Sequence, residues 1–328
     1  MGLLNGAKMS SSKGNVFLLE DAVREFGADT VRMFLVGSAE PWQDFDWRND
    51  LVASTRRQID RFALLVRESL QAGDEPGAMD CWLESRFQGH ISRTTQALER
   101  FQTRQAVQEA FSSIEADLKW YRRRLPPGSS GGLSLREMCS AWVRLLAPFI
   151  PFTAERLWQE LNGEGLVSFA AWPEPAHERV DGALEISEEL LARTVEDIES
   201  ILKVIKLAPT RITLFAAPGW KRAIFSAVAS AENKNTVIKE IMREEEMRKR
   251  GKEVTDAVRQ CTTLIHRLPP AIVSGLLQEM PDETALFKEA SGFLSREFGV
   301  PVTVEDAEPS THPRASSALP FKPAIVIE

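Results

Sequence analysis

Two lysines and three consecutive serines lie close together near the start of the chain, in the stretch AKMSSSKGNV at residues 7–16. Ammonium groups, hydroxyls and backbone N–H groups are donors suited to phosphate oxygens, and a glycine lets a backbone approach its ligand closely. The stretch therefore predicts a loop that contacts phosphate or pyrophosphate. Composition alone favours the alternative, a flexible serine linker with solvated lysines. The candidate contacts are Lys8, Met9, Ser10, Ser11, Ser12, Lys13 and Gly14.

Two common kinds of site are excluded. The Walker A pattern needs Gly-Lys-Ser/Thr at the start of a helix, but Gly14 is followed by Asn15, and no earlier glycine has the required spacing. The three cysteines are far apart, without CxxC spacing or neighbouring histidines. A zinc site or a disulfide framework is therefore not expected, and we expect no bound metal in the chain itself.

Length and composition indicate an ordinary soluble protein. The 328 residues are enough for two or three domains, and 43% of them are apolar and 27% charged. No apolar run is long enough to span a membrane, and no secretion leader precedes the loop, so we expect a cytosolic protein. The net charge of −7 argues against wholesale polyanion binding. Nucleic acid could therefore bind only through local basic patches.

The elements that must position the loop begin directly after it. Residues 18–37 predict two short helices, the first with an apolar stripe at Leu19, Ala22, Val23 and Phe26. Gly27 would end it, and Asp29 would cap the second helix. The acidic, aromatic stretch AEPWQDFDW then breaks the helical pattern.

The middle of the chain predicts an antiparallel helix bundle. Four long helices with apolar faces follow one another, the first beginning near residue 50. A short helix after PFIPF would close the bundle. The second helix carries a stripe from Leu83 to Phe101, and the third carries a stripe from Val107 to Tyr121 and ends in three arginines. The fourth contains Trp142, which we assign to the core.

The last part predicts a small α/β domain, which follows the connector AAWPEPAHERVDG. The segments RITLFAA, PVTVE and KPAIVIE have the composition of strands, and helical runs are expected at 220–230, 236–250, 254–268 and 285–298. The polar stretch at 305–317 predicts a mobile loop. The expected fold class is mostly α, with domains at 1–49, 50–175 and 176–328.

Several motifs resemble the class I aminoacyl-tRNA synthetases. KMSSS at residues 8–12 resembles their KMSKS signature, and GADTVRMFLVGSAEPWQDFDW continues in the same register. The segments LERFQTRQAVQEAF and LAPFIPFTAERLWQEL are similar to the anticodon-binding helical domain of the leucine, isoleucine, valine and methionine subgroup. The ending ALPFKPAIVIE resembles the leucyl-tRNA synthetases of archaeal and eukaryotic cytosolic type. The resemblance covers essentially the whole chain.

The resemblance implies an activity and its substrates. The family joins leucine to tRNA-Leu and uses ATP as a substrate, and we expect the ATP to bind with Mg²⁺ and no prosthetic group to be needed. Lys8 and Lys13 would be the catalytic cations, and the whole loop at 8–14 would bind ATP and pyrophosphate. The residue at the signature's fourth position, usually lysine, is Ser11 in this sequence.

The resemblance also implies a partner. No HIGH-type motif is present, because the one Gly-His pair, Gly89-His90, lies inside a helical stripe. No nucleotide-binding fold fits before Lys8 either. The chain thus resembles a C-terminal portion in which Met1 is an internal methionine and residues 1–49 are the end of a catalytic domain. It would need the N-terminal catalytic and editing portion and be inactive by itself.

Contacts with tRNA are expected from arginines of the bundle and from the end of the chain. The bundle candidates are Arg57, Arg61, Arg122, Arg123 and Arg124, for which a solvated helix face is the alternative. Ile327 and Glu328 could present backbone groups to bases, or the segment could simply complete a sheet. Two other functions stay open: a standalone tRNA-binding module without catalysis, and a portion of an isoleucine, valine or methionine synthetase.

Overall fold

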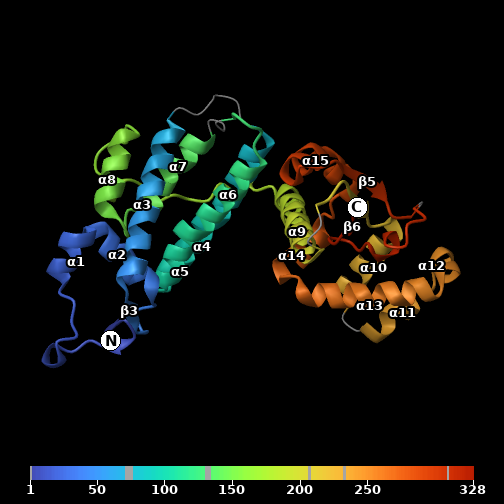
Figure 1. The fold of residues 1–328 in the computed structure, drawn as a ribbon, viewed down its shortest axis with the longest axis horizontal. Helices are drawn as coiled ribbons and strands as arrows, with labels where there is room; N and C mark the ends of the chain where they lie inside the picture. The colour runs from blue at the N-terminus through green and yellow to red at the C-terminus, as the bar shows by residue number, and fades with distance from the viewer. Residues whose placement is uncertain (1, 71–76, 130–133, 206–207, 232–233, 309) are drawn as a thin grey trace. The chain divides into compact units, whose positions relative to one another are not determined.

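The computed structural model describes residues 2–70, 77–129, 134–205, 208–231, 234–308 and 310–328 (Figure 1). The chain divides into two compact units, Met1–Val180 and Asp181–Glu328. Helices make up most of each unit and each contains one three-stranded sheet, which confirms the expected mostly α fold class. Among the described residues, no helix is long and apolar enough to cross a membrane.

A small sheet near the start of the first unit was not predicted. It has the order β2-β1-β3, with β1 antiparallel to β2 and parallel to β3. Asn5 and Gly6, both with positive φ, form the tight turn between β1 and β2, as expected of an Asn-Gly hairpin turn. The strands are β1 Gly2–Leu4, β2 Ala7–Lys8 and β3 Phe45–Trp47.

Helices α1 (Leu19–Phe26) and α2 (Ala28–Ser38) follow, as predicted. They pack around Trp47, whose ring lies 5.1–6.1 Å from the rings of Phe17, Phe26 and Phe34. The predicted stripe of α1 is only half correct. Ala22 and Phe26 are buried, but Leu19 is 63% exposed and Val23 39% exposed.

Asp29 does not cap α2, which was the prediction. It lies in the first turn of that helix, and its carboxylate accepts hydrogen bonds from the backbone N–H groups of Phe152 (3.2 Å) and Thr153 (2.6 Å). These groups belong to the first turn of α8 (Pro151–Glu160). Asp29 therefore caps a helix far away in the sequence, and Gly27, with φ of 86°, occupies the N-cap position of α2.

The predicted helix bundle is present in the first unit (Figure 1). Helix α4 packs against α6 and α7, and α7 also packs against α3 and α8. Trp142 is fully buried and lies 4.6 Å from Phe62 and 6.1 Å from Phe111 between ring centroids. The helices are α3 Asn49–Ser69, α4 Ala78–Glu99, α5 Thr103–Val107, α6 Ile114–Arg124 and α7 Ser134–Leu146.

One predicted feature of the bundle needs detail and another is wrong. The third helix is present, but Gln108–Ser113 forms a π-helical segment within it, between α5 and α6. The Trp142 indole donates to the Ala110 carbonyl within that segment at 2.6 Å, and such an inserted side chain is a usual partner of a distorted helix. Phe101 is not part of the buried stripe. It is 76% exposed and has a φ of 56° directly after α4.

The second unit is the predicted small α/β domain. Its sheet has the order β5-β4-β6, with β4 parallel to β5 and antiparallel to β6. The strands are β4 Ile212–Ala216, β5 Val302–Asp306 and β6 Ala324–Ile327. The helices are α9 Gly182–Ile205, α10 Gly219–Ser230, α11 Lys234–Ile241, α12 Glu245–Arg250, α13 Lys252–Arg267, α14 Pro270–Gln278 and α15 Glu283–Phe298.

Two expectations for this unit need correction. The single helix expected at 236–250 is two helices, α11 and α12, because Arg248 reaches back to the carbonyls of Met242 and Arg243 at 3.3 Å. The stretch at 305–317, expected to be a mobile loop, packs on the sheet. His312 stacks on Phe215 with ring centroids 5.5 Å apart, and Ala315 is buried.

Candidate functional site

The loop at residues 8–14 is anchored at both ends in the core around Trp47. Met9, directly after β2, packs on this core, whereas Lys8, the last residue of β2, is exposed. The ring of Phe17, which follows the loop, packs against Trp47 with ring centroids 5.1 Å apart. The loop is therefore fixed by apolar contacts on one side, and its polar groups remain accessible on the other.

Backbone hydrogen bonds close the loop between Ser10 and Asn15. The Ser10 N–H donates to the Asn15 carbonyl at 2.8 Å, and the Asn15 N–H donates back at 3.2 Å. Residues Ser11–Lys13 between them form one 3₁₀ turn. The Asn15 side-chain amide donates to the carbonyls of Ala7 (3.3 Å) and Lys8 (3.1 Å). Asn15 thus ties the loop to β2, a role that the sequence motif did not reveal.

The loop presents its cations to solvent. Lys8 and Lys13 are exposed, and neither forms an ion pair with any residue that the structure describes. Gly14 has a φ of 66° with open space around it. The Ser10 and Ser12 hydroxyls lie 3.0 Å apart, while the Ser11 side chain lies outside the described part. The predicted contacts are thus together on one closed loop that can offer ammonium and hydroxyl donors to an anion.

The start of α1 does not add to this site. Its first turn carries Glu20 and Asp21, both exposed. Carboxylates at a helix N-terminus occupy the positive end of the helix dipole and disfavour a second anion. Donors for a phosphate therefore come from the loop and not from the helix that follows it.

Two of the predicted arginines share a groove in the bundle. Arg61 of α3 and Arg122 of α6 line a cavity of about 510 Å³ together with Lys119. Arg61 pairs with Glu115 and Arg122 with Glu68, at 3.2 and 3.1 Å. Lys119, which was not predicted, is exposed and forms no ion pair within the described residues. The groove presents three cations to a polyanion, two of them already paired.

The other predicted arginines lie outside this groove. Arg57 is exposed on α3. Arg123 lies over the Trp120 ring, 5.9 Å from its centroid, and Arg124 is the last residue of α6. The structure therefore brings together only Arg61 and Arg122 of the five candidates.

A buried polar network fixes α4 to the helices that carry this groove. His90, only 2% exposed, contacts Asp117 at 2.9 Å and Glu109 at 3.3 Å. The hydrogen bond from His90 to Glu109, together with the charge and hydrogen bond of Arg93, lowers the pKa of Glu109 to about 2. Burial would raise the pKa of Asp117, but His90 and Arg86 outweigh it and lower the pKa. The side chain of His90 thus holds neighbouring helical segments of the bundle together, and Gly89-His90 does not act as a nucleotide-binding motif.

The end of the chain forms an edge strand. Ile327 of β6 pairs with Ile212 of β4. The Glu328 carbonyl accepts from Thr210 and Arg211, and the Glu328 N–H donates to the Arg211 carbonyl at 3.0 Å. One side of β6 is thus engaged in the sheet, as the sheet-completing alternative expected.

Comparisons with known proteins identify relatives of this chain. Residues 80–214 match the anticodon-binding domain of tRNA ligase. Over the whole chain, the sequence is 39% identical to the leucine–tRNA ligase of Pyrococcus abyssi, covering 34% of that protein. It is 35% identical to that of Methanosarcina mazei, over 99% of the chain and 35% of that protein.

A solved structure also resembles part of the chain. It is a ternary complex of LeuRS from Agrobacterium radiobacter K84 with tRNA and LeuAMS. The match covers 76% of this chain and 29% of that chain, with 21% sequence identity and a TM-score of 0.47.

The similarity to the curated leucine–tRNA ligases extends over essentially the whole chain. The chain spans about a third of their length. Over essentially its whole length, the sequence is thus similar to one part of the leucine–tRNA ligases.

Proposed function

We propose that this chain is the C-terminal portion of a leucine–tRNA ligase and supplies its pyrophosphate-binding loop and part of its tRNA-binding surface. The observation that carries the proposal is the closed loop at 8–14, on which Lys8 and Lys13 are exposed and pair with no carboxylate of the residues that the structure describes. In the proposed organisation, residues 1–49 end the catalytic domain, 50–175 form the anticodon-binding bundle and 176–328 form a C-terminal tRNA-binding domain. The cytoplasm is the proposed location.

The chemical task of the loop is to stabilise a leaving group. When the leucine carboxylate attacks the α-phosphate of ATP, the bond to pyrophosphate breaks and negative charge grows on the departing oxygens. Ammonium groups held in place before the reaction stabilise that charge. Asn15 and the Ser10–Asn15 hydrogen bonds would hold Lys8 and Lys13 in position. Any Mg²⁺ would arrive with the ATP phosphates, since the loop offers ammonium and hydroxyl groups and no carboxylate.

The activity would require the remaining part of the ligase. The apolar arc of α1 supports this requirement, because Ala22 and Phe26 are covered by the chain's own core but Leu19 and Val23 are exposed. Exposed apolar side chains at i and i+4 form one continuous patch on a helix. We propose that the N-terminal catalytic and editing portion covers this patch, and that the isolated chain is inactive.

The proposed tRNA contacts are the groove cations Arg61 and Arg122, the neighbouring Arg57, Arg123 and Arg124, and the strand end at Ile327 and Glu328. The groove supports contact with the phosphate backbone of the tRNA, because three cations line it. The outer edge of β6 supports contact with bases, because its backbone groups on that side face away from β4. Phosphate contacts would provide affinity, and base contacts would provide specificity.

Binding of the chain to leucine tRNA tests the proposal. At one fixed salt concentration, we expect tight binding that weakens markedly when the variable arm of the tRNA is shortened. Replacing both Arg61 and Arg122 by alanine should lower the slope of log affinity against log salt by about 2, the value for two lost phosphate contacts. Arg24→Ala, at an exposed position on α1, is the matched control and should leave the slope unchanged. Weak binding with the same affinity for leucine tRNA with the full and with the shortened variable arm would contradict the proposal.

A further inference from the structure

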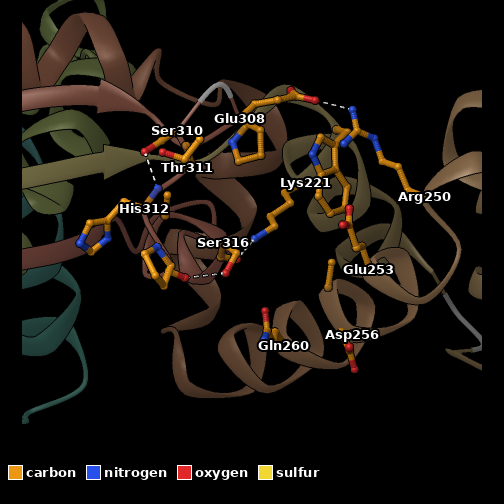
Figure 2. Close-up of a pocket in the computed structure, with 16 residues that line it drawn as sticks. Lys221, Arg250, Glu253, Asp256, Gln260, Glu308, Ser310, Thr311, His312 and Ser316 are labelled. Carbon is orange, nitrogen blue, oxygen red and sulfur yellow. Dashed lines mark hydrogen bonds and ion pairs between the residues drawn. The ribbon is translucent and has the colours of Figure 1, made fainter.

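A cavity of about 620 Å³ lies within the second unit, between the start of α10, one face of α13 and the segment that follows β5 (Figure 2). Its volume is in the range of small-molecule sites, about 300–1,000 Å³. Nothing in the proposed function uses it. Its walls include Trp220 and Lys221 from α10, Glu253 and Gln260 from α13, and His312 from the segment after β5.

The cavity contains a buried positive charge. Lys221 is only 5% exposed, and its Nζ donates to the carbonyls of Ser316 (2.5 Å) and Ala318 (2.8 Å). Both partners are neutral, and no carboxylate of the described residues lies within ion-pair distance of the ammonium group. A buried charge is costly unless it is paired, and accordingly burial lowers the pKa of Lys221. An ammonium group has three donors, so one remains for an anion in the cavity.

Trp220 and Arg250 form the wall of the cavity beside Lys221. The Trp220 ring lies 4.9 Å from the Arg250 guanidinium and 5.5 Å from the Lys221 ammonium. Arg250 pairs with Glu308 and so neutralises that carboxylate. Its Nε is buried without a hydrogen-bond partner in the described part of the chain. This corner of the cavity therefore holds donors that protein groups leave unused.

The wall on α13 offers hydrogen-bond acceptors. Figure 2 shows Glu253, Asp256 and Gln260 along that helix. Asp256 pairs with Arg259 at 3.2 Å, whereas Glu253 and Gln260 are exposed and have no side-chain partner within the described residues. A ligand that fits both walls has an anionic end for Lys221 and amino or ring N–H groups for Glu253 and Gln260.

We propose that this cavity binds a single nucleotide, with its phosphate at Lys221 and its base toward Glu253 and Gln260. Nucleotides combine one phosphate with a flat base whose edge carries hydrogen-bonding groups, which is the combination that the walls require. The nucleotide can be free in solution or be an unstacked nucleotide of an RNA. This site belongs to the second unit and does not depend on the ligase activity.

The test measures binding of AMP to the whole 328-residue chain by titration calorimetry, with adenosine as the ligand that lacks the phosphate. We expect saturable binding of AMP and binding of adenosine that is weaker by about tenfold or more, the effect of one charge-assisted hydrogen bond. Lys221→Met should weaken AMP by a similar factor. Lys288→Met, at an exposed position on α15, is the matched control and should bind AMP like the wild type.

A second variant keeps the test valid if Lys221→Met misfolds. Gln260→Leu changes an exposed side chain and should weaken AMP by at least about threefold while leaving the binding of inorganic phosphate unchanged. Leucine tRNA that displaces AMP would identify an RNA nucleotide as the occupant, and tRNA that binds beside AMP would identify a free nucleotide. Absence of saturable AMP binding, or folded variants at 221 and 260 that bind AMP like the wild type, would overturn the proposal.

Discussion

Replacing Glu283 by glutamine should remove most of the pH dependence of the stability of the second unit between pH 4.5 and about pH 7. Glu283 is 1% exposed, and its carboxyl group accepts from the backbone N–H groups of Phe321 (2.7 Å) and Ala217 (3.3 Å). Burial nevertheless raises its pKa from 4.5 to about 7. The backbone hydrogen bonds favour the ionised form but do not outweigh the loss of solvent.

The sign of the effect follows from the two pKa values. Below pH 4.5 the carboxyl group is protonated in the folded and the unfolded chain. Between pH 4.5 and about 7 it ionises mainly in the unfolded chain, so unfolding releases a proton and the free energy of unfolding falls as pH rises. At about 1.4 kcal/mol per pKa unit, the total decrease is about 3 kcal/mol. Above about pH 7 both states are ionised and the decrease is complete.

Native-state hydrogen exchange measures this free energy in the second unit alone. The amides of Leu214 in β4 and Ile325 in β6 are suitable probes because both residues are buried in the sheet. Glu283→Gln should show a nearly flat profile across the window, whatever its absolute stability. Glu289→Gln, at an exposed position on the same helix, should keep the wild-type slope. Equal slopes for the wild type and Glu283→Gln would refute the reasoning.

Three further predictions concern the first unit. Asp29→Ala should destabilise it by about 2 kcal/mol in urea denaturation, because two N–H groups of α8 lose their cap, whereas Asp21→Ala at an exposed site should have little effect. Asn15→Ala should speed hydrogen exchange at the Ser10 amide by about tenfold, since two hydrogen bonds that brace the loop are lost. Trp142→Phe should lower the free energy of unfolding in urea by about 1–3 kcal/mol, because the Ala110 carbonyl loses its hydrogen-bond donor. An unchanged stability would show that the indole does not stabilise the π-helical segment.

Helices with long apolar stripes were predictable from the sequence, but short and distant pairings were not. Helices α3 and α7 are present where long apolar faces were predicted, and α4 follows its predicted stripe except at Phe101, because apolar faces that recur over several turns are a strong signal. Strands β1 and β2 have only two or three residues, too few for a periodic pattern, and β1 pairs with β3 some 40 positions away. The Asn5-Gly6 turn was the local signal that could have revealed the hairpin.

The loop at 8–14 could be proposed from its residue types, whereas the groups that support it could not. Asn15 acts on carbonyls of β2, so its role depends on the hairpin that places them within reach. Aspartate is a residue type that often caps helices, but which helix Asp29 caps is set by tertiary packing. Pairs such as Arg61 with Glu115 join different helices, and helical spacing does not specify them.

The central claim is that the loop stabilises the departing pyrophosphate in a leucine–tRNA ligase, and leucine-dependent pyrophosphate exchange tests it most directly. In the intact ligase that contains this chain, Lys8→Ala should lower the exchange rate by at least about tenfold, because one preorganised donor to the developing charge is lost. Lys288→Ala, at an exposed position on α15, is the control and should exchange at the wild-type rate. An exchange rate for Lys8→Ala equal to that of the wild type would contradict the account.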